Sequence, residues 1–164
     1  MLGLSSGQVL LSPYESGWRT LFLEEMGRLQ ASIGGYVLDI QHIGSTSIPG
    51  ILAKPILDIG IAVANFEEAV RCIPPIEELE YTYKGENGIS RRHYFIKGVS
   101  RTHHVHMIEM DSEEWNSLLL FRDYLIMNPK TARQYVRLKR ELVKQFATGR
   151  YFGAMPLACI GGNS

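Results

Sequence analysis

The sequence predicts an α/β domain in which a small mixed sheet is flanked by helices. Residues 55–64 are almost entirely apolar, which is typical of a strand covered on both faces. Residues 91–97 and 104–110 have the composition of two strands, and the short turn between them indicates a β-hairpin. Apolar residues recur at helical spacing in the segments around these strands, so helices are expected to pack on the sheet.

The first helix is expected to begin at Ser12-Pro13-Tyr14-Glu15. Ser12 would cap it, Pro13 suits the first helical position, and Glu15 completes a capping box. The apolar stripe continues to Ile33, and Gly34-Gly35 ends the helix. An apolar strand over residues 36–42 is expected to follow.

The middle of the chain is expected to contain a second helix and a short strand. Asn65 caps a helix that starts at Phe66. Pro74-Pro75 must break or kink this helix, because proline removes a backbone donor and clashes with the preceding turn. Residues 81–84 are expected to form a short strand before the hairpin.

Two further helices are expected after the hairpin. Asp111 and Glu114 open the first of them in a capping arrangement. Asn128-Pro129 ends this helix and starts the next one, which Gly149 closes. Each helix carries an apolar stripe, so both are expected to pack against the rest of the domain.

The bulk properties favour one domain without a strong global charge. The chain has 164 residues, which is long enough to bury a core. Residues 1–150 are expected to form the domain, and the small, uncharged and aperiodic residues 151–164 an atypical tail. Lys plus Arg and Asp plus Glu number 17 each, so no global field attracts nucleic acid or a membrane surface.

The sequence also favours a cytoplasmic protein. No apolar run reaches the roughly 18 residues that a transmembrane helix needs, and the N-terminus lacks a basic secretion-signal region. Cys72 and Cys159 are far apart and have no metal-ligand spacing. Both are therefore expected to be free thiols in a reducing compartment.

A Gly-Ser turn is the first candidate for chemistry. The strand over residues 36–42 runs into Gly44-Ser45, and Thr46 and Ser47 extend the cluster of hydroxyl groups. Backbone N–H groups and a serine hydroxyl at such a turn can hold phosphate oxygens. The alternative is a tight strand-to-helix turn in which serine caps the next segment.

Asp58 is the second candidate, because it lies in the apolar strand over residues 55–64. A carboxylate buried there needs a hydrogen-bonding partner, a counter-charge or a metal ion. Gly60 shares the face of Asp58, and its missing side chain would leave space for a ligand. The alternative is an ion pair between Asp58 and Lys54 or an arginine of the hairpin.

The second hairpin strand offers two different polar faces. His104 and His106 share one face, whereas His103 and Glu109 share the opposite one. Either pair could point toward Asp58. Two histidines separated by one residue on a strand are a recurring ligand arrangement, so a transition-metal site at His104 and His106 is one hypothesis. A hydrogen-bonded polar sheet face is the alternative.

The first hairpin strand is locally basic. Arg91, Arg92 and Lys97 would suit an anionic ligand, although a solvated edge strand is the default interpretation. The charges of the last two helices, Lys139 among them, are interpreted as ordinary helical surface charge. Arg122 is the exception, because it interrupts an apolar stripe and could reach inward.

These motifs together resemble a known protein family. The segment HIGSTSIPGILAKPILDI, followed by THHVHMIEM, FRDYLIMNP and ARQYVRLKREL, is similar to the GrpB-like proteins of the nucleotidyltransferase superfamily. The resemblance covers roughly residues 10–147 and implies a nucleotidyltransferase-like fold. The superfamily pattern is a Gly-Ser turn, two acids one residue apart on the next strand, and a third acid on a later strand. Asp58 matches the first acid, Glu109 is the candidate for the third, and Gly60 replaces the second.

The resemblance implies a divergent nucleotidyltransferase that binds a nucleoside triphosphate with Mg²⁺. Ser45 and the turn would hold the triphosphate, while Lys54 and Arg92 would neutralise its charge. Two-metal phosphoryl transfer needs carboxylates that bridge two ions, so the missing acid favours an alternative. In that alternative the protein is a non-catalytic nucleotide-binding or anion-binding module with a regulatory role, as the fusion of family members to dephospho-coenzyme A kinase suggests.

The expected partner is thus a small phosphate-containing molecule, and the expected site has two parts. Asp58 and Glu109 are the expected catalytic and metal-binding residues. The expected ligand-binding residues are Gly44, Ser45, Thr46, Ser47, Lys54, Arg92, His93, His104 and His106.

Overall fold

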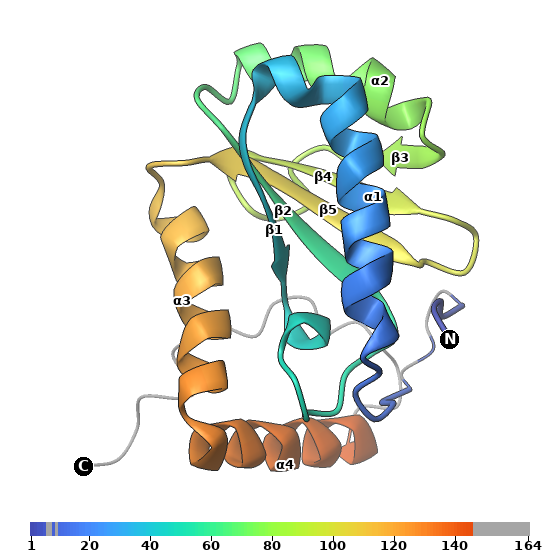
Figure 1. Cartoon of the computed structure of the whole chain (residues 1–164), viewed down its shortest axis with the longest axis vertical. Coiled ribbons are helices and arrows are strands. Elements are labelled where there is room, and N and C mark those ends of the chain that lie inside the picture. The colour runs from blue at the N-terminus through green and yellow to red at the C-terminus, as the bar shows by residue number, and fades with distance from the viewer. Residues whose placement is uncertain (6–7, 9, 146–164) are drawn as a thin grey trace.

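Five strands form one mixed sheet in the computed structural model, which describes residues 1–5, 8 and 10–145 (Figure 1). The order of the strands across the sheet is β1-β2-β5-β4-β3. β2 and β5 run parallel, and the other neighbouring strands are antiparallel. The strands are β1 (Val37–Ile43), β2 (Leu57–Val63), β3 (Tyr81–Tyr83), β4 (Arg92–Lys97) and β5 (His103–Glu109).

Helices cover the two faces of this sheet unequally. α1 lies across one face, α3 stands beside the other side of the sheet, and α4 runs across the base of the molecule (Figure 1). This arrangement confirms the predicted mixed sheet with flanking helices. The helices are α1 (Gly17–Ile33), α2 (Ile73–Glu77), α3 (Glu113–Met127) and α4 (Pro129–Gln145), and short 3₁₀ turns cover Gly34–Tyr36, Ser45–Ser47 and Glu68–Cys72.

The main core lies between α1 and the sheet. Trp18 and Leu29 of α1 are fully buried against Ile59 and Ile61 of β2, and Phe95 of β4 belongs to the same cluster. The strand predicted over residues 55–64 is therefore covered on its α1 face by a continuous apolar layer. Burial of apolar surface on this scale is the principal source of the stability of such a domain.

α3 covers only part of the opposite face. Trp115 of α3 packs on Ala62 of β2 and Ile108 of β5 in a small, separate cluster. At the other end of the two strands the same face carries polar side chains. This face of the sheet therefore has an apolar region under α3 and a polar region that contains Asp58.

Three helix boundaries differ from those predicted. Ser12 does not cap a helix, because its backbone forms a β-bridge with Ala53, and α1 begins later, at Gly17. Pro74 and Pro75 lie at the start of a new helix, α2, where proline is tolerated. The N-cap of α3 is Ser112, whose Oγ accepts a hydrogen bond from the Trp115 backbone N–H at 3.1 Å.

Other local predictions agree in part with the described residues. The hairpin forms with Arg92 opposite Ile108. Asn65 Oδ1 accepts a hydrogen bond from the Glu68 backbone N–H at 2.9 Å, but the helix expected from Phe66 is only a short 3₁₀ turn over Glu68–Cys72. The predicted helix end at Gly149 and the tail over residues 151–164 lie outside the described residues.

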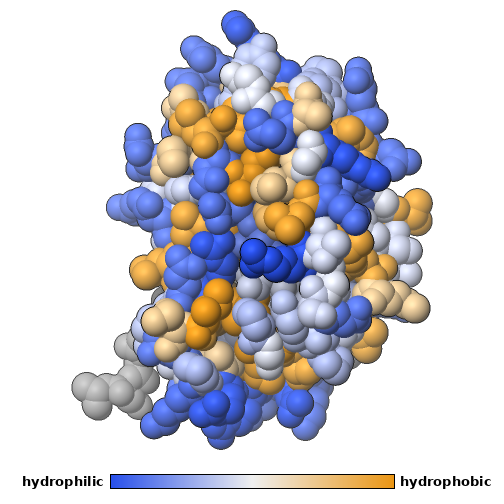
Figure 2. All heavy atoms as spheres, in the orientation of Figure 1, coloured by the Kyte–Doolittle hydropathy of each residue, from blue (hydrophilic) through white to orange (hydrophobic). Residues whose placement is uncertain are grey.

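The surface has mixed polarity on the side that shows α1. Hydrophilic and apolar residues are interspersed on it, and neither kind dominates (Figure 2). Cys72 is buried as a free thiol, and burial raises its pKa. Among the described helices, none has both the length and the apolar character that crossing a bilayer requires.

Candidate functional site

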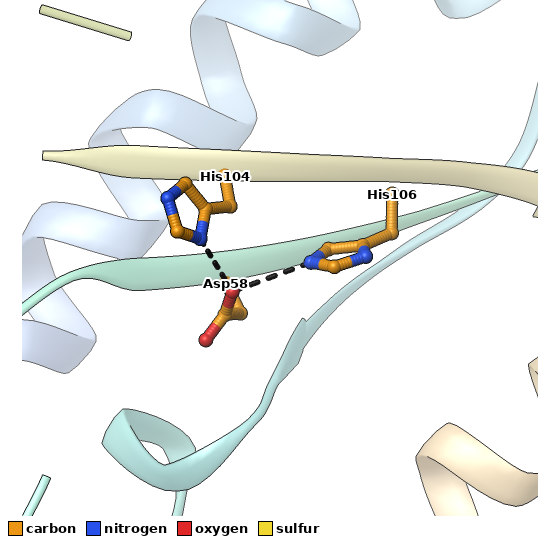
Figure 3. A group of neighbouring side chains, drawn as sticks. All are labelled: Asp58, His104 and His106. Carbon is orange, nitrogen blue, oxygen red and sulfur yellow. Dashed lines mark hydrogen bonds and ion pairs between the residues drawn. The ribbon is translucent and has the colours of Figure 1, made fainter. Parts of the chain in front are cut away.

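Asp58 lies beside two histidines of the neighbouring strand. The parallel register places Asp58 opposite His104 and Gly60 opposite His106, so both imidazoles project from the face of Asp58. Asp58 Oδ1 is 3.3 Å from His104 Nδ1 and 3.3 Å from His106 Nε2 (Figure 3). The pair that faces Asp58 is thus His104 and His106. Both imidazoles form hydrogen bonds with the carboxylate, for which an ion pair with a lysine or an arginine was the alternative.

Arg92 determines which nitrogen of His106 carries the proton. Its Nη1 lies 3.2 Å from His106 Nδ1. A guanidinium can only donate hydrogen bonds, so Nδ1 accepts, and the proton of the neutral ring is on Nε2, which donates to Asp58. Burial lowers the pKa of His106, which keeps this ring neutral. Arg92 is itself held by the backbone carbonyls of Glu86 and Asn87.

The two imidazoles keep Asp58 ionised. Burial by itself would raise the pKa of this carboxyl, but the hydrogen bonds from His104 and His106 hold the pKa well below its usual range. Both imidazoles donate to the same oxygen, Oδ1. Asp58 therefore keeps Oδ2 for another interaction.

The Gly44 turn lies against that second oxygen. Ile43 pairs with Asp58 across β1 and β2, so the turn after β1 lies beside the carboxylate. Gly44 has a φ of +68°, and a Cβ there would lie 2.6 Å from Asp58 Oδ2. Only glycine combines this backbone conformation with so close an approach. The Gly-Ser turn is therefore a structural requirement of the Asp58 site.

The three hydroxyl groups after Gly44 have different roles. The Thr46 side chain is buried, and its Oγ1 lies 3.0 Å from His42 Nε2. The Ser47 hydroxyl donates to the Gly44 carbonyl oxygen at 2.5 Å, as expected for a capped tight turn. Ser45 alone directs its hydroxyl to a charged side chain of another element, Lys139 of α4.

Lys139 is a buried cation next to the turn. Its Nζ donates to Ser45 Oγ at 2.8 Å and to the Leu52 carbonyl oxygen at 3.1 Å, and it lies 5.0 Å from the centre of the Tyr135 ring. The residue is only 3% exposed. Burial lowers the pKa of Lys139 to about 8, although the charge of Asp58 acts in the opposite direction. The interpretation of Lys139 as surface charge was therefore wrong.

A signal for Lys139 was present in the helical spacing. Ala132 and Tyr135 belong to the apolar stripe of α4, and Lys139 follows Tyr135 by four residues on the same stripe. Ala132 is buried against α3, and Tyr135 packs there too. A lysine on the apolar stripe of a helix is a candidate to point inward, where its ammonium group needs a specific hydrogen-bonding partner.

Cations outnumber the carboxylate in this part of the molecule. Lys54, Arg92 and Lys139 all lie within the electrostatic field of Asp58. Burial lowers the pKa of Lys54 and the pKa of Arg92, so neither cation is fully solvated. The charge of Glu114 also acts on Arg92, so three cationic side chains lie near two carboxylates, and the remaining positive charge favours an anionic ligand.

The structure does not bring Glu109 to Asp58. Glu109 lies at the other end of β5, and it is on the opposite face because it follows His104 by five positions, an odd offset along a strand. Its carboxylate accepts hydrogen bonds from Arg91 at 2.8 Å and from the Phe66 backbone N–H at 3.0 Å. The expected Asp58–Glu109 metal pair is therefore not formed.

His93 and two of the hairpin cations also lie elsewhere. The His93 ring is held between the Tyr83 hydroxyl and the Phe66 carbonyl oxygen, each at 2.8 Å, on the opposite side of β4 from Arg92. Lys97 forms a buried ion pair with Glu25 of α1 at 2.7 Å. Arg91 pairs with Glu67 and Glu109. Arg92 is thus the hairpin cation that faces Asp58.

The space expected at Gly60 is filled by protein. A Cβ at this position would lie 3.0 Å from Trp115 Cζ3 and 3.3 Å from Ile43 Cγ2. The absence of a side chain at Gly60 accommodates the indole of α3 and leaves no room for a ligand. Gly60, which stands where the superfamily has its second acid, thus belongs to the packing contact between α3 and the sheet.

Replacing Gly60 with aspartate is expected to destabilise the protein and not to create a metal-binding pair. Overpacking costs about 1–3 kcal/mol, and an unpaired carboxylate among apolar groups adds to it. The free energy of unfolding should therefore fall by roughly 3 kcal/mol or more, as measured by urea denaturation. Gly27→Asp is a matched control, because a Cβ there meets no atom within 4 Å. Equal stabilities of the two variants would contradict this account of Gly60.

Arg122 reaches inward, as predicted. Its Nη1 donates to the Gln41 side-chain oxygen at 2.8 Å and to the His42 carbonyl oxygen at 2.9 Å. These bonds fasten α3 to β1 directly before the Gly44 turn. Arg122 therefore helps to position the turn without contacting Asp58 itself.

The fold and the Gly-Ser turn beside a strand carboxylate define a domain of the nucleotidyltransferase-like superfamily. The GrpB protein family matches residues 8–154, and the chain belongs to that family. A crystal structure of GrpB from Enterococcus faecalis has a TM-score of 0.82 and 36% sequence identity, and the match covers 92% of each chain. The family and the fold that the sequence motifs predicted are thus confirmed.

Two further relatives differ in length. The chain is 34% identical over 152 residues to the glutamate-rich protein GrpB of Alkalihalophilus pseudofirmus, a match that covers 89% of this chain and 87% of the relative. It is 45% identical over 133 residues to YqkA of Bacillus subtilis, and this match covers 80% of this chain but only 39% of YqkA. The chain therefore spans about two fifths of the length of YqkA.

Proposed function

We propose that this protein binds a phosphate-containing small molecule, such as a nucleoside triphosphate, between the Gly44 turn and the Asp58 face of the sheet. The observation that carries the proposal is the contact between Lys139 and Ser45. A buried lysine held against the hydroxyl of a Gly-Ser turn places a positive charge and a hydroxyl donor side by side. Phosphate oxygens are suited to this combination of donors.

Lys139 has donor capacity to spare for such a ligand. An ammonium group has three N–H donors, and the structure shows two of them used, toward Ser45 and Leu52. A phosphate oxygen close to Ser45 could accept the third. Arg92 and Lys54 add further positive charge near Asp58. The phosphate chain would thus be neutralised by side chains from β4, α4 and the segment before β2.

The residues present do not fit a pair of Mg²⁺ ions. Two-metal phosphoryl transfer requires carboxylates that bridge the ions, and neither Gly60 nor Glu109 supplies a second carboxylate beside Asp58. Mg²⁺ can be held by one carboxylate together with ligand phosphates and water, so one ion at Asp58 Oδ2 is the most that the carboxylate supports. We therefore favour binding over nucleotidyl transfer as the function of the site.

Calorimetric titration tests the proposal directly. ATP, GTP, coenzyme A precursors and inorganic triphosphate would each be titrated into the protein, with and without Mg²⁺. Saturable binding of at least one of them is expected, and it should weaken in the Asp58→Ala variant if Mg²⁺ is required. Failure of all of these ligands to bind would overturn the proposal.

The affinity for triphosphate is expected to fall as the pH rises through about 8. Lys139, whose pKa is lowered to about 8 by burial, loses its charge in this range, while a nucleoside triphosphate such as ATP is already fully ionised. The free energy of unfolding should change in the opposite direction. Above pH 8 the unfolded chain holds a proton on this lysine that the folded protein has lost, so stability rises until the ordinary lysine pKa of about 10.4.

Calorimetry and urea denaturation across this pH range measure both trends. The Lys139→Met variant should lose most of each pH dependence, and a residual slope in binding is expected from Lys54, whose pKa burial also lowers. An affinity that is independent of pH in the wild-type protein would contradict a role for Lys139.

A further inference from the structure

The donor atoms around Asp58 are of mixed type. One carboxylate and two imidazoles offer one oxygen and two nitrogens, and all three atoms lie within 4.8 Å of one another. Mg²⁺ and Ca²⁺ are bound through oxygen atoms, whereas imidazole nitrogen suits zinc, iron, copper and nickel. The donor set thus differs from the carboxylate set that phosphoryl-transfer enzymes use for Mg²⁺.

The two N···O separations match those between neighbouring ligands of one metal ion. The two N···O distances of 3.3 Å are longer than the value near 2.9 Å that is usual for N–H···O hydrogen bonds. In a tetrahedral zinc site with bonds of about 2.0–2.1 Å, neighbouring ligand atoms are roughly 3.3–3.4 Å apart. The carboxylate oxygen thus already lies at a ligand-to-ligand distance from each imidazole, and rotation of the imidazoles would bring their nitrogens, now within 4.8 Å of each other, onto one ion.

The backbone presents the three ligands from fixed positions. Asp58 is in β2, and His104 and His106 are in β5, which pairs with β2 along its whole length. The side chains are between 16% and 29% exposed, so an ion can reach them from solvent. Three protein ligands leave at least one coordination position open, as in catalytic zinc sites. Figure 3 shows both imidazoles, which come from β5, directed at the carboxylate.

We propose that Asp58, His104 and His106 form a binding site for a divalent transition-metal ion of the zinc class. The site lies next to the proposed phosphate site but is inferred from its own ligands, so either proposal can fail without the other. Zn²⁺ and Co²⁺ would bind in preference to Mg²⁺. An open coordination position would let the ion contact an oxygen of water or of a bound anion.

Arg92 limits the affinity of this site. Metal binding at His106 Nε2 moves the imidazole proton to Nδ1, where the Arg92 guanidinium now donates a hydrogen bond at 3.2 Å. Two donors cannot face each other, so the guanidinium must turn away when the ion binds. Its positive charge opposes the ion as well. Removing this charge should therefore strengthen metal binding, which a purely structural role of Arg92 would not do.

Titration of the full chain with Co²⁺, followed by visible absorption, tests the proposal. One equivalent of Co²⁺ should give the spectrum of a four- or five-coordinate site, Zn²⁺ should displace it, and excess Mg²⁺ should not. His104→Gln and Asp58→Asn should weaken binding tenfold or more. His103→Gln, on the other face of β5, is the matched control and should bind as the wild type does. Arg92→Leu should bind more tightly.

Circular dichroism establishes that each variant is folded. Asp58→Asn keeps the shape of the side chain, so the test stands even if a histidine variant fails to fold. Absence of a cobalt spectrum in both the wild type and Arg92→Leu would overturn the proposal. Unchanged cobalt binding by folded Asp58→Asn and His104→Gln would overturn it too.

Discussion

Replacing Gly44 with alanine is expected to abolish triphosphate binding and to destabilise the fold. Gly44 has a φ of +68° and a ψ of −172°, a backbone conformation that costs a residue with a Cβ about 1–3 kcal/mol. The added methyl group would also lie 2.6 Å from Asp58 Oδ2 and 3.0 Å from Asp58 Cβ. Relieving this overlap requires the turn or the carboxylate to move, at a further cost of about 1–3 kcal/mol. Urea denaturation and calorimetric titration with inorganic triphosphate measure the two effects.

Gly50→Ala is the matched control for this prediction. Gly50 has a φ of +80°, but a Cβ there meets no atom within 4 Å. The control therefore also places a Cβ on a residue with a positive φ, but without the collision at Asp58. We expect it to lose about 1–2 kcal/mol and to keep its affinity for triphosphate. If both variants lost binding equally, the contact between the Gly44 turn and Asp58 would not explain the requirement for glycine.

Lys139→Met is expected to weaken triphosphate binding by roughly 10- to 100-fold. A hydrogen bond to a charged group contributes about 1.5–3 kcal/mol, and a phosphate oxygen would lose this contact. Methionine has a similar length and no charge. Stability should change little, because the loss of the bonds to Ser45 and Leu52 is offset by removing a desolvated cation. Calorimetry and urea denaturation of the same variant separate binding from folding.

Lys144→Met provides the control for net charge. Lys144 is on the same helix and is exposed, so its replacement removes one positive charge from α4 without touching the turn. Its effect on triphosphate affinity should be less than about threefold, since exposed charges are screened by salt. A loss of affinity as large as that of Lys139→Met would show that only the overall charge of α4 matters.

The elements that could be predicted from the sequence are those whose pattern is local. The apolar run of β2 and the alternating strands of the hairpin are each determined within a few residues, and both formed as predicted. The start of α1 was misplaced because Ser12 engages Ala53, which is 41 positions away. A favourable local cap was outcompeted there by a long-range bridge.

The site was predicted only in part, because the register between strands is not visible in one strand. Alternation alone allowed either His104 and His106 or Glu109 to face Asp58, and the pairing of β2 with β5 selected the histidines. The missing side chain of Gly60 indicated free space, but Trp115 of α3 fills it. Lys139 comes from a helix far along the chain, and only its position on the apolar stripe of α4 marked it.

Backbone amide NMR during a titration with inorganic triphosphate tests the central claim most directly. The claim is that the anion binds between the Gly44 turn and the Asp58 face of the sheet, within reach of Lys139, so the largest shifts should occur at Gly44, Ser45 and Lys139. The amides of Glu67 and Arg91, at the far end of the sheet, should stay unchanged. Saturable shifts confined to the turn and the adjacent part of α4 are the predicted result. Shifts that cluster around Arg91, or no saturable shifts at all, would contradict the account.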